Sequence, residues 1–129
     1  MRIILTVLLL LLAACELPTE STVGSPEDTP ITGLTLSVDS TYLSGSVMVA
    51  RGRVWNNGSS ATVPTWYVEA VFYTDATFST KLGGNSTAMN FGLDPGQSSF
   101  WSISFSTSAV DVRQFPNFRV KDVRGVYKR

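Results

Sequence analysis

The stretch WYVEAVFY, residues 66–73, decides the fold. Its residues alternate between two faces, and one face is apolar throughout: Trp66, Val68, Ala70 and Phe72. The opposite face carries Tyr67, Glu69, Val71 and Tyr73. An alternation with a period of two predicts a β-strand that has its apolar face in a core and its mixed face nearer to solvent.

The same alternation recurs on both sides of this strand, and no stretch shows the 3.6-residue period of a helix. Toward the N-terminus two strands are predicted, and their expected inner faces are Leu34, Leu36 and Val38, and then Met48, Ala50, Gly52 and Val54. Arg51, Arg53 and Trp55 fall on the outer face of the second of these strands. We expect Arg51 and Arg53 to pair with Glu69 across neighbouring strands.

Toward the C-terminus two short strands are predicted around residues 78–82 and 87–91, with Gly83-Gly84-Asn85 between them. After a turn at Asp94-Pro95-Gly96, apolar residues alternate with serine, which makes Trp101 an expected centre of the core. The last strand has Phe118 and Val120 inward, and the pattern then slips by one residue to Val123, Gly125 and Tyr127. That slip predicts a β-bulge near Asp122.

These patterns give about seven short strands in residues 33–129, and they predict an all-β fold, an immunoglobulin-like β-sandwich. A small closed barrel is the alternative. A parallel α/β fold is excluded, because its crossover connections need helices for which the sequence has neither pattern nor room.

Composition excludes several classes of function. The 129 residues contain ten basic and ten acidic side chains, no His and one Cys. Without His, the commonest general base and the commonest metal ligand are missing, and one Cys allows neither an internal disulfide nor a Cys-based zinc site. Zero net charge argues against nucleic acid as a partner. We therefore expect no enzyme, no catalytic residue, no metal and no cofactor.

The N-terminus carries the most specific motif. Arg2 is followed by residues 3–14, of which eleven of twelve are apolar. As a helix these would span roughly 18 Å, against roughly 30 Å for a bilayer core, so a cleaved export signal is expected rather than a transmembrane anchor. The stretch ends Leu12-Ala13-Ala14-Cys15, which resembles the lipobox of bacterial lipoproteins.

That resemblance implies that Cys15 receives the lipid and that the chain is cut before it. The protein would then be held at a membrane through the lipid on Cys15, because two or three acyl chains anchor stably. Glu16 follows the cysteine, where enteric lipoproteins retained in the inner membrane carry Asp. An outer-membrane location facing the periplasm is favoured, with the inner membrane or the cell surface as alternatives.

The expected domain organisation has three parts: residues 1–14 are a lipoprotein signal peptide, 15–32 a lipidated Cys with a disordered tether, and 33–129 the sandwich. Residues 16–32 contain three prolines, four acidic residues and no basic one, a composition that cannot form a core.

Three further motifs resemble one family of domains. These are Gly52-x-Val54-x-Asn56, the run from Val68 to Asp75 with Phe72-Tyr73, and Leu93-x-Pro95-Gly96 before an aromatic strand. Together they resemble FxLYD-type domains, which are immunoglobulin-like modules of exported prokaryotic proteins, lipoproteins among them. The resemblance covers roughly residues 44–107 and implies a fold, but supplies no functional residue.

Two candidate binding surfaces follow from the strand patterns. Arg119, Lys121 and Arg124 are expected to project outward as a basic row that could contact anionic lipid or a cell-wall polymer, or simply be solvated. Tyr67 and Tyr73, on the outer face of the 66–73 strand, could stack on sugar or contact a partner protein, or be covered by a neighbouring segment.

The sequence therefore favours a non-catalytic, lipid-anchored cell-envelope module that binds an envelope protein or acts as an accessory subunit. The alternative is a small-ligand or glycan binder that uses exposed aromatics.

Overall fold

The computed structural model of the protein describes residues 23–25 and 27–128. Within them it contains seven β-strands and one short 3-10 helix, so the predicted all-β fold is confirmed. The signal peptide, Cys15 and the first part of the tether lie outside the described residues. The elements are β1 (Thr29–Pro30), β2 (Leu34–Ser44), β3 (Val47–Asn56), β4 (Trp66–Tyr73), β5 (Lys81–Met89), β6 (Ser98–Phe105), η2 (Val112–Gln114) and β7 (Arg119–Tyr127). In this part of the chain no helix is long and apolar enough to cross a membrane.

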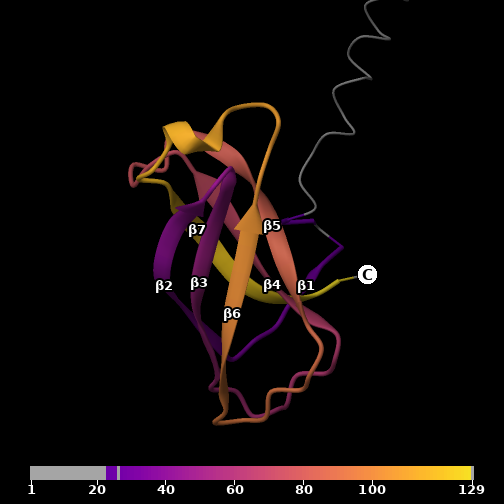
Figure 1. Ribbon diagram of the computed structural model, residues 1–129. Coiled ribbons are helices and arrows are strands. Elements are labelled where there is room, and N and C mark those ends of the chain that lie inside the picture. Colours follow the sequence, from indigo (N-terminus) through magenta and orange to yellow (C-terminus); the bar gives the residue numbers. More distant parts are fainter. Residues whose placement is uncertain (1–22, 26, 129) are drawn as a thin grey trace, which may run out of the picture.

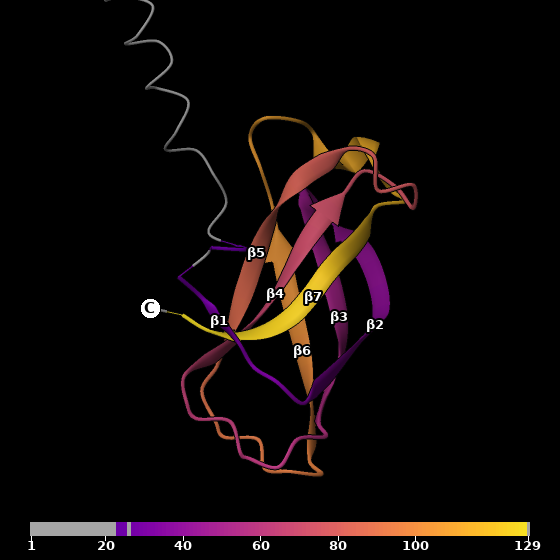
Figure 2. The ribbon, with the colours of Figure 1, turned by 180° about the vertical axis from the view of Figure 1, so that it is seen from behind.

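The strands form two antiparallel sheets that pack face to face as a β-sandwich. Sheet A has the order β1-β7-β4-β5, and sheet B has the order β2-β3-β6. Sheet B lies in front in Figure 1, and sheet A lies in front when the molecule is seen from behind in Figure 2. Each sheet therefore has one face in the core and one outer face, and these two outer faces point in opposite directions.

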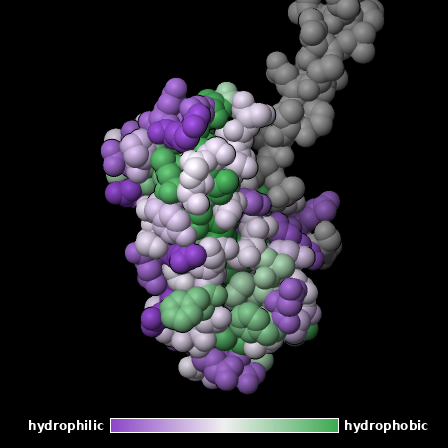
Figure 3. Space-filling view, viewed as in Figure 1, coloured by the Kyte–Doolittle hydropathy of each residue, from purple (hydrophilic) through white to green (hydrophobic). Residues whose placement is uncertain are grey.

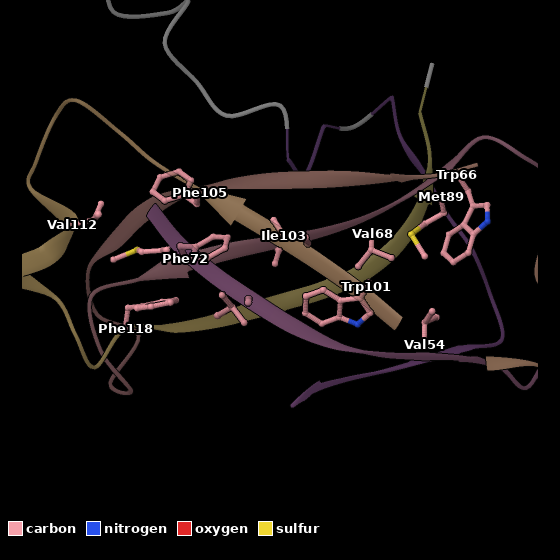
Figure 4. Packing of buried hydrophobic residues seen from close by; sticks show 14 of the residues in the cluster. Val54, Trp66, Val68, Phe72, Met89, Trp101, Ile103, Phe105, Val112 and Phe118 are labelled. Carbon is pink, nitrogen blue, oxygen red and sulfur yellow. The ribbon is translucent and has the colours of Figure 1, made fainter. Parts of the chain in front are cut away.

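The core consists of the apolar rows that the sequence predicted. Trp66, Val68, Ala70 and Phe72 are fully buried, which confirms the inner face of β4. Trp101 and Ile103 of β6 pack between the sheets (Figure 4), and Trp101 is buried as expected. Phe72 stacks on the rings of Phe105 and Phe118, with centroids 5.0 and 5.9 Å apart.

Gly52 of β3 makes room for Trp101. A Cβ atom at residue 52 would overlap the backbone carbonyl of Ser37 and the Trp101 ring. The indole N–H of Trp101 donates to the carbonyl oxygen of Arg53 at 3.2 Å, so its polar atom is satisfied although the ring is buried. This glycine is therefore required by the close approach of two neighbours within sheet B, the backbone of β2 and the Trp101 ring of β6.

The predicted bulge is present in β7. Glu69 of β4 pairs with Arg124, and Val71 pairs with Lys121, so two residues of β7 lie opposite one residue of β4. Asp122 has a positive φ of 54° at this point. The extra residue places Lys121 and Arg124 on the same outer face although they are three positions apart.

Two expectations about strands were wrong. The two short strands expected around residues 78–82 and 87–91 are one strand, β5, which continues through Gly83 and Gly84. A Cβ atom at Gly83 would lie 2.9 Å from the Phe105 ring, so this glycine serves sheet packing rather than a turn. Val38 was expected in the buried row and is 42% exposed: it pairs with Gly52 on the inner side of β2, but β2 is an edge strand, and Val38 lines a solvent-open cleft with Val120 of β7.

The last part of the expected tether belongs to the folded domain. Thr29 and Pro30 form β1, which pairs with Tyr127 and Val126 of β7. The next residue, Ile31, donates its N–H to the carbonyl of Gly125 at 2.9 Å. Disorder through residue 32 was therefore wrong for this part: composition predicted little burial, but backbone pairing with β7 orders the segment.

Candidate functional site

The sequence-predicted candidate residues lie together on the outer face of sheet A. Tyr67 and Tyr73 belong to β4, and Arg119, Lys121 and Arg124 belong to the adjacent β7. Tyr73 pairs directly with Arg119, and Tyr67 lies opposite Val126, at the other end of the shared register. Because β4 and β7 are neighbours in sheet A (Figure 2), the basic row and the tyrosine face, which were predicted as separate surfaces, lie on one face of this sheet.

At the centre of this face is a buried ion pair. Glu69 is fully buried, and its Oε1 accepts hydrogen bonds from Nε of Arg124 and, at 3.3 Å, from the backbone N–H of Gly24. Lys128 Nζ lies 3.7 Å from Oε2 of Glu69 and 3.5 Å from Oδ2 of Asp28. These contacts connect β4, the end of β7 and the N-terminal segment.

The ion pair corrects two predictions. Arg124 does lie on the outer face, but it is held by Glu69 and its side chain is only 37% exposed, so it does not belong to a free basic row. Glu69 does not pair with Arg51 and Arg53, because these arginines lie on β3 in the other sheet. The remaining members of the row, Arg119 and Lys121, are exposed as expected.

The aromatic side chains of this face are already engaged. Lys128 Nζ lies 5.5 Å from the ring centre of Tyr67, and Lys121 Nζ lies 5.3 Å from that of Phe78. The rings of Phe78 and Tyr73 are perpendicular, with their centres 5.3 Å apart. Tyr67 and Tyr73 are both half-buried, which agrees with the alternative that neighbouring segments cover them.

A cleft of about 500 Å³ lies beside the Glu69 ion pair. Its walls combine the aliphatic Val23, Val71 and Val123 with two acidic and two basic side chains, those of Glu69, Asp122, Lys81 and Arg124. Since its charges have both signs, this cleft offers no clear preference for an anion or a cation. Val23 and Gly24 form part of its wall, so the N-terminal segment already occupies this side of the domain.

The outer face of sheet B carries a second surface, which we call the aromatic–arginine face: Tyr42, Arg51, Arg53, Trp55 and Phe100. Arg53 lies opposite Phe100 in the register, with its guanidinium carbon 4.9 Å from the Phe100 ring centre and 5.7 Å from that of Trp55. Arg51 lies 5.5 Å from the ring centre of Tyr42. Phe100 is 70% exposed and Tyr42 is 37% exposed.

This face is open and mixed in character. Figure 3 shows it from the front, with hydrophobic residues beside hydrophilic ones on the surface over sheet B. A shallow cleft of about 320 Å³ on this face is lined by Arg51, Phe100, Trp101 and Ser102. Among the described residues, neither Arg51 nor Arg53 has an ion pair.

The sequence contained a signal for this surface. Residues 51, 53 and 55 alternate with the buried row of β3, and Phe100 directly precedes the buried Trp101, so parity alone places all of them outward. The contact between Arg53 and Phe100 could not be predicted in the same way, because it depends on the register in which β3 pairs with β6. The partner expected for these arginines, Glu69, lies in the other sheet.

The resolved pKa shifts belong to local turns rather than to these two faces. Hydrogen bonds from the side chain and the backbone N–H of Thr77 lower the pKa of Asp75. The side chain and the backbone N–H of Arg113 lower the pKa of Asp111, and this contact raises the pKa of Arg113 in turn. The described residues contain no group of three or more His, Cys, Asp and Glu side chains that could hold a metal ion.

No protein-family profile, no curated protein and no solved structure matches this chain. The resemblances to lipoproteins and to FxLYD-type domains therefore remain predictions.

Proposed function

We propose that the protein is a non-catalytic module of the bacterial cell envelope, anchored by lipid on Cys15, which binds an envelope protein or serves as an accessory subunit. The observation that carries the proposal is the position of the aromatic–arginine face relative to the N-terminal segment. Gly24 is hydrogen-bonded to Glu69 on the outer face of sheet A, whereas the aromatic–arginine face is on the opposite side of the sandwich.

A lipid on Cys15 would keep sheet A close to the membrane. Eight residue steps separate Cys15 from Val23, which at full extension reach at most about 28 Å. The outer face of sheet A would then lie on the membrane side of the domain, with the exposed Arg119 and Lys121 near the lipid headgroups. The aromatic–arginine face would point away from the membrane, where a partner could reach it.

The residue types of this face suit a protein partner. Trp, Tyr and Arg are the side chains that most often dominate binding energy at protein interfaces, and Phe is also enriched there. On this face, aromatic rings lie beside Arg51 and Arg53, and both arginines are on β3, the central strand of sheet B. Energetically important residues gather near the centre of an interface, as these arginines would.

The anchoring half of the proposal is tested by metabolic labelling with radioactive palmitate in a bacterial host. The wild-type protein should incorporate label and sediment with membranes, because the thiol of Cys15 accepts the lipid. Cys15→Ser should incorporate none and accumulate as an uncut precursor. Equal labelling of the two proteins would exclude lipidation at this residue.

A glycan-binding function is the second candidate, and the shallow cleft beside the exposed Phe100 favours it. Aromatic rings on an open surface can stack on sugar rings. If this function is correct, the protein should sediment with purified peptidoglycan sacculi, and Phe100→Ala should abolish sedimentation. If the protein stays in the supernatant, the protein-binding proposal is favoured.

A further inference from the structure

We infer that the aromatic–arginine face binds an extended, acidic segment of a partner protein, with two carboxylates spaced as in Glu-x-Glu. This inference deepens the proposed function. It rests on that function in one respect, which is that the partner is expected in the cell envelope. It is carried by the spacing, the preorganisation and the unbalanced charge of Arg51 and Arg53.

The spacing follows from the strand that carries the two arginines. Arg51 and Arg53 are two positions apart on β3, so both point outward and their Cα atoms are separated by about 7 Å. Carboxylates on alternate residues of an extended peptide have the same separation. A segment that lies along β3 could therefore place one carboxylate on each arginine.

The aromatic rings hold both guanidinium groups in place. Arg53 is stacked against both Trp55 and Phe100, and Arg51 lies over Tyr42. A guanidinium that lies over a ring keeps its N–H groups available in the plane for a bidentate carboxylate. Because the rings already restrict the side chains, less conformational entropy is lost on binding.

The charge of this face is unbalanced. Neither arginine has an ion pair among the described residues, and Asp39, the one acidic side chain on β2, β3 and β6, can offset at most one of their two charges. On the outer face of sheet A, Glu69 neutralises Arg124, and Arg119 and Lys121 remain there without an ion pair among the described residues, so the two faces differ in the aromatic rings around the arginines rather than in charge alone. An acidic partner is therefore the electrostatic complement of sheet B.

The size of the face fits a segment rather than a whole domain. The ten residues of β3 extend about 33 Å, and three strands measure roughly 10–15 Å across. This footprint accommodates one extended peptide of eight to ten residues. It is smaller than the surface of about 800 Å² per partner that a standard interface between two globular proteins requires.

The test measures the binding of a fluorescent (Glu-Thr)5 peptide to the full-length lipidated protein in detergent micelles, by fluorescence anisotropy at low salt. The (Gln-Thr)5 peptide is the uncharged control. We expect (Glu-Thr)5 to bind about tenfold more tightly than (Gln-Thr)5, since two charge-assisted contacts are lost in the control. The double variant Arg51→Gln, Arg53→Gln should remove this difference.

The matched control is the double variant Arg119→Gln, Lys121→Gln, which removes two exposed charges from the other sheet and should bind like wild type. Phe100→Ala, whose ring is largely exposed, should weaken binding while leaving the circular dichroism spectrum and the melting temperature unchanged. Equal binding of the two peptides, or no binding of either, would overturn the inference. So would tighter binding of polygalacturonate than of (Glu-Thr)5, which would assign the face to an acidic glycan. The same assay is repeated with the Cys15→Ser protein, which should show the same preference for (Glu-Thr)5, because Cys15 is not part of the aromatic–arginine face. The binding result therefore stands even if palmitate labelling shows no lipid on Cys15.

Discussion

Replacing Arg124 with methionine tests the buried ion pair on the outer face of sheet A. Arg124→Met keeps an unbranched, apolar stem but removes the charge that faces Glu69. The carboxylate of Glu69 is fully buried, so it would be left with the backbone N–H of Gly24 and with Lys128 Nζ at 3.7 Å. We expect a large loss of stability, because an incompletely compensated charge remains inside the protein.

The expected magnitude follows from the burial of each partner. Removing one member of a buried pair destabilises a protein by about 3–5 kcal/mol, and the remaining contact with Lys128 places Arg124→Met at the lower end, about 3 kcal/mol. The reverse change, Glu69→Gln, leaves a charge on Arg124, which is 37% exposed and can be hydrated, so we expect a loss of only about 1 kcal/mol. The double variant Glu69→Leu, Arg124→Met should be within about 1 kcal/mol of wild type, since no unpaired charge stays buried.

Urea denaturation followed by circular dichroism measures these free energies of unfolding. Arg119→Met is the matched control, because it removes an exposed charge from the same strand and the same face and should change stability by less than about 0.5 kcal/mol. If Arg124→Met and Arg119→Met proved equally stable, or if Glu69→Gln were the more damaging change, the ion pair would not support the fold as argued.

Trp101→Ala should lower the free energy of unfolding by about 3–5 kcal/mol, because the ring is buried between the sheets; an unchanged melting temperature would contradict its place in the core. Removing residues 1–22 should leave the stability of the domain within about 1 kcal/mol of the full chain, whereas removing residues 1–32 should lower it further, because β1 and the contacts of Gly24 and Asp28 are lost. Equal melting temperatures of the two truncated proteins would show that this segment adds no stability. The soluble domain should bind anionic vesicles weakly at low salt and release them near physiological salt, where the screening length falls to about 8 Å. The double variant Arg119→Ser, Lys121→Ser should not bind, because it lacks the two exposed charges of β7. If this variant sedimented with the vesicles as wild type does, the basic pair would be excluded as a membrane contact.

The sequence predicted the core of this fold well because burial in a sheet has a period of two. The rows that contain Trp66, Phe72, Trp101 and Phe118 were all placed inward correctly. The division of β5 into two strands failed because glycine has two roles: it favours turns, but it also permits the close approach of another side chain, and Gly83 has the second role against the Phe105 ring. Local sequence does not distinguish these roles.

The outer faces were harder to predict, because what covers or completes them is distant in sequence. Glu69 is contacted by Gly24, 45 residues before it, and by Arg124, 55 residues after it. An alternating pattern shows that residue 69 faces away from the core, but it cannot show that another segment buries that face. The pairing of Arg53 with Phe100 likewise depends on strand register.

The central claim, that lipid holds the sheet A side near the membrane while the aromatic–arginine face receives a protein, is tested most directly by photocrosslinking in intact cells. A benzoylphenylalanine replaces either Phe100 on sheet B or Lys121 on sheet A in the full-length protein, and the adducts are identified by mass spectrometry. The account predicts protein adducts from residue 100 that disappear in the double variant Arg51→Gln, Arg53→Gln, and lipid adducts from residue 121. Lipid adducts from residue 100, or protein adducts from it that persist in the double variant, would contradict the account.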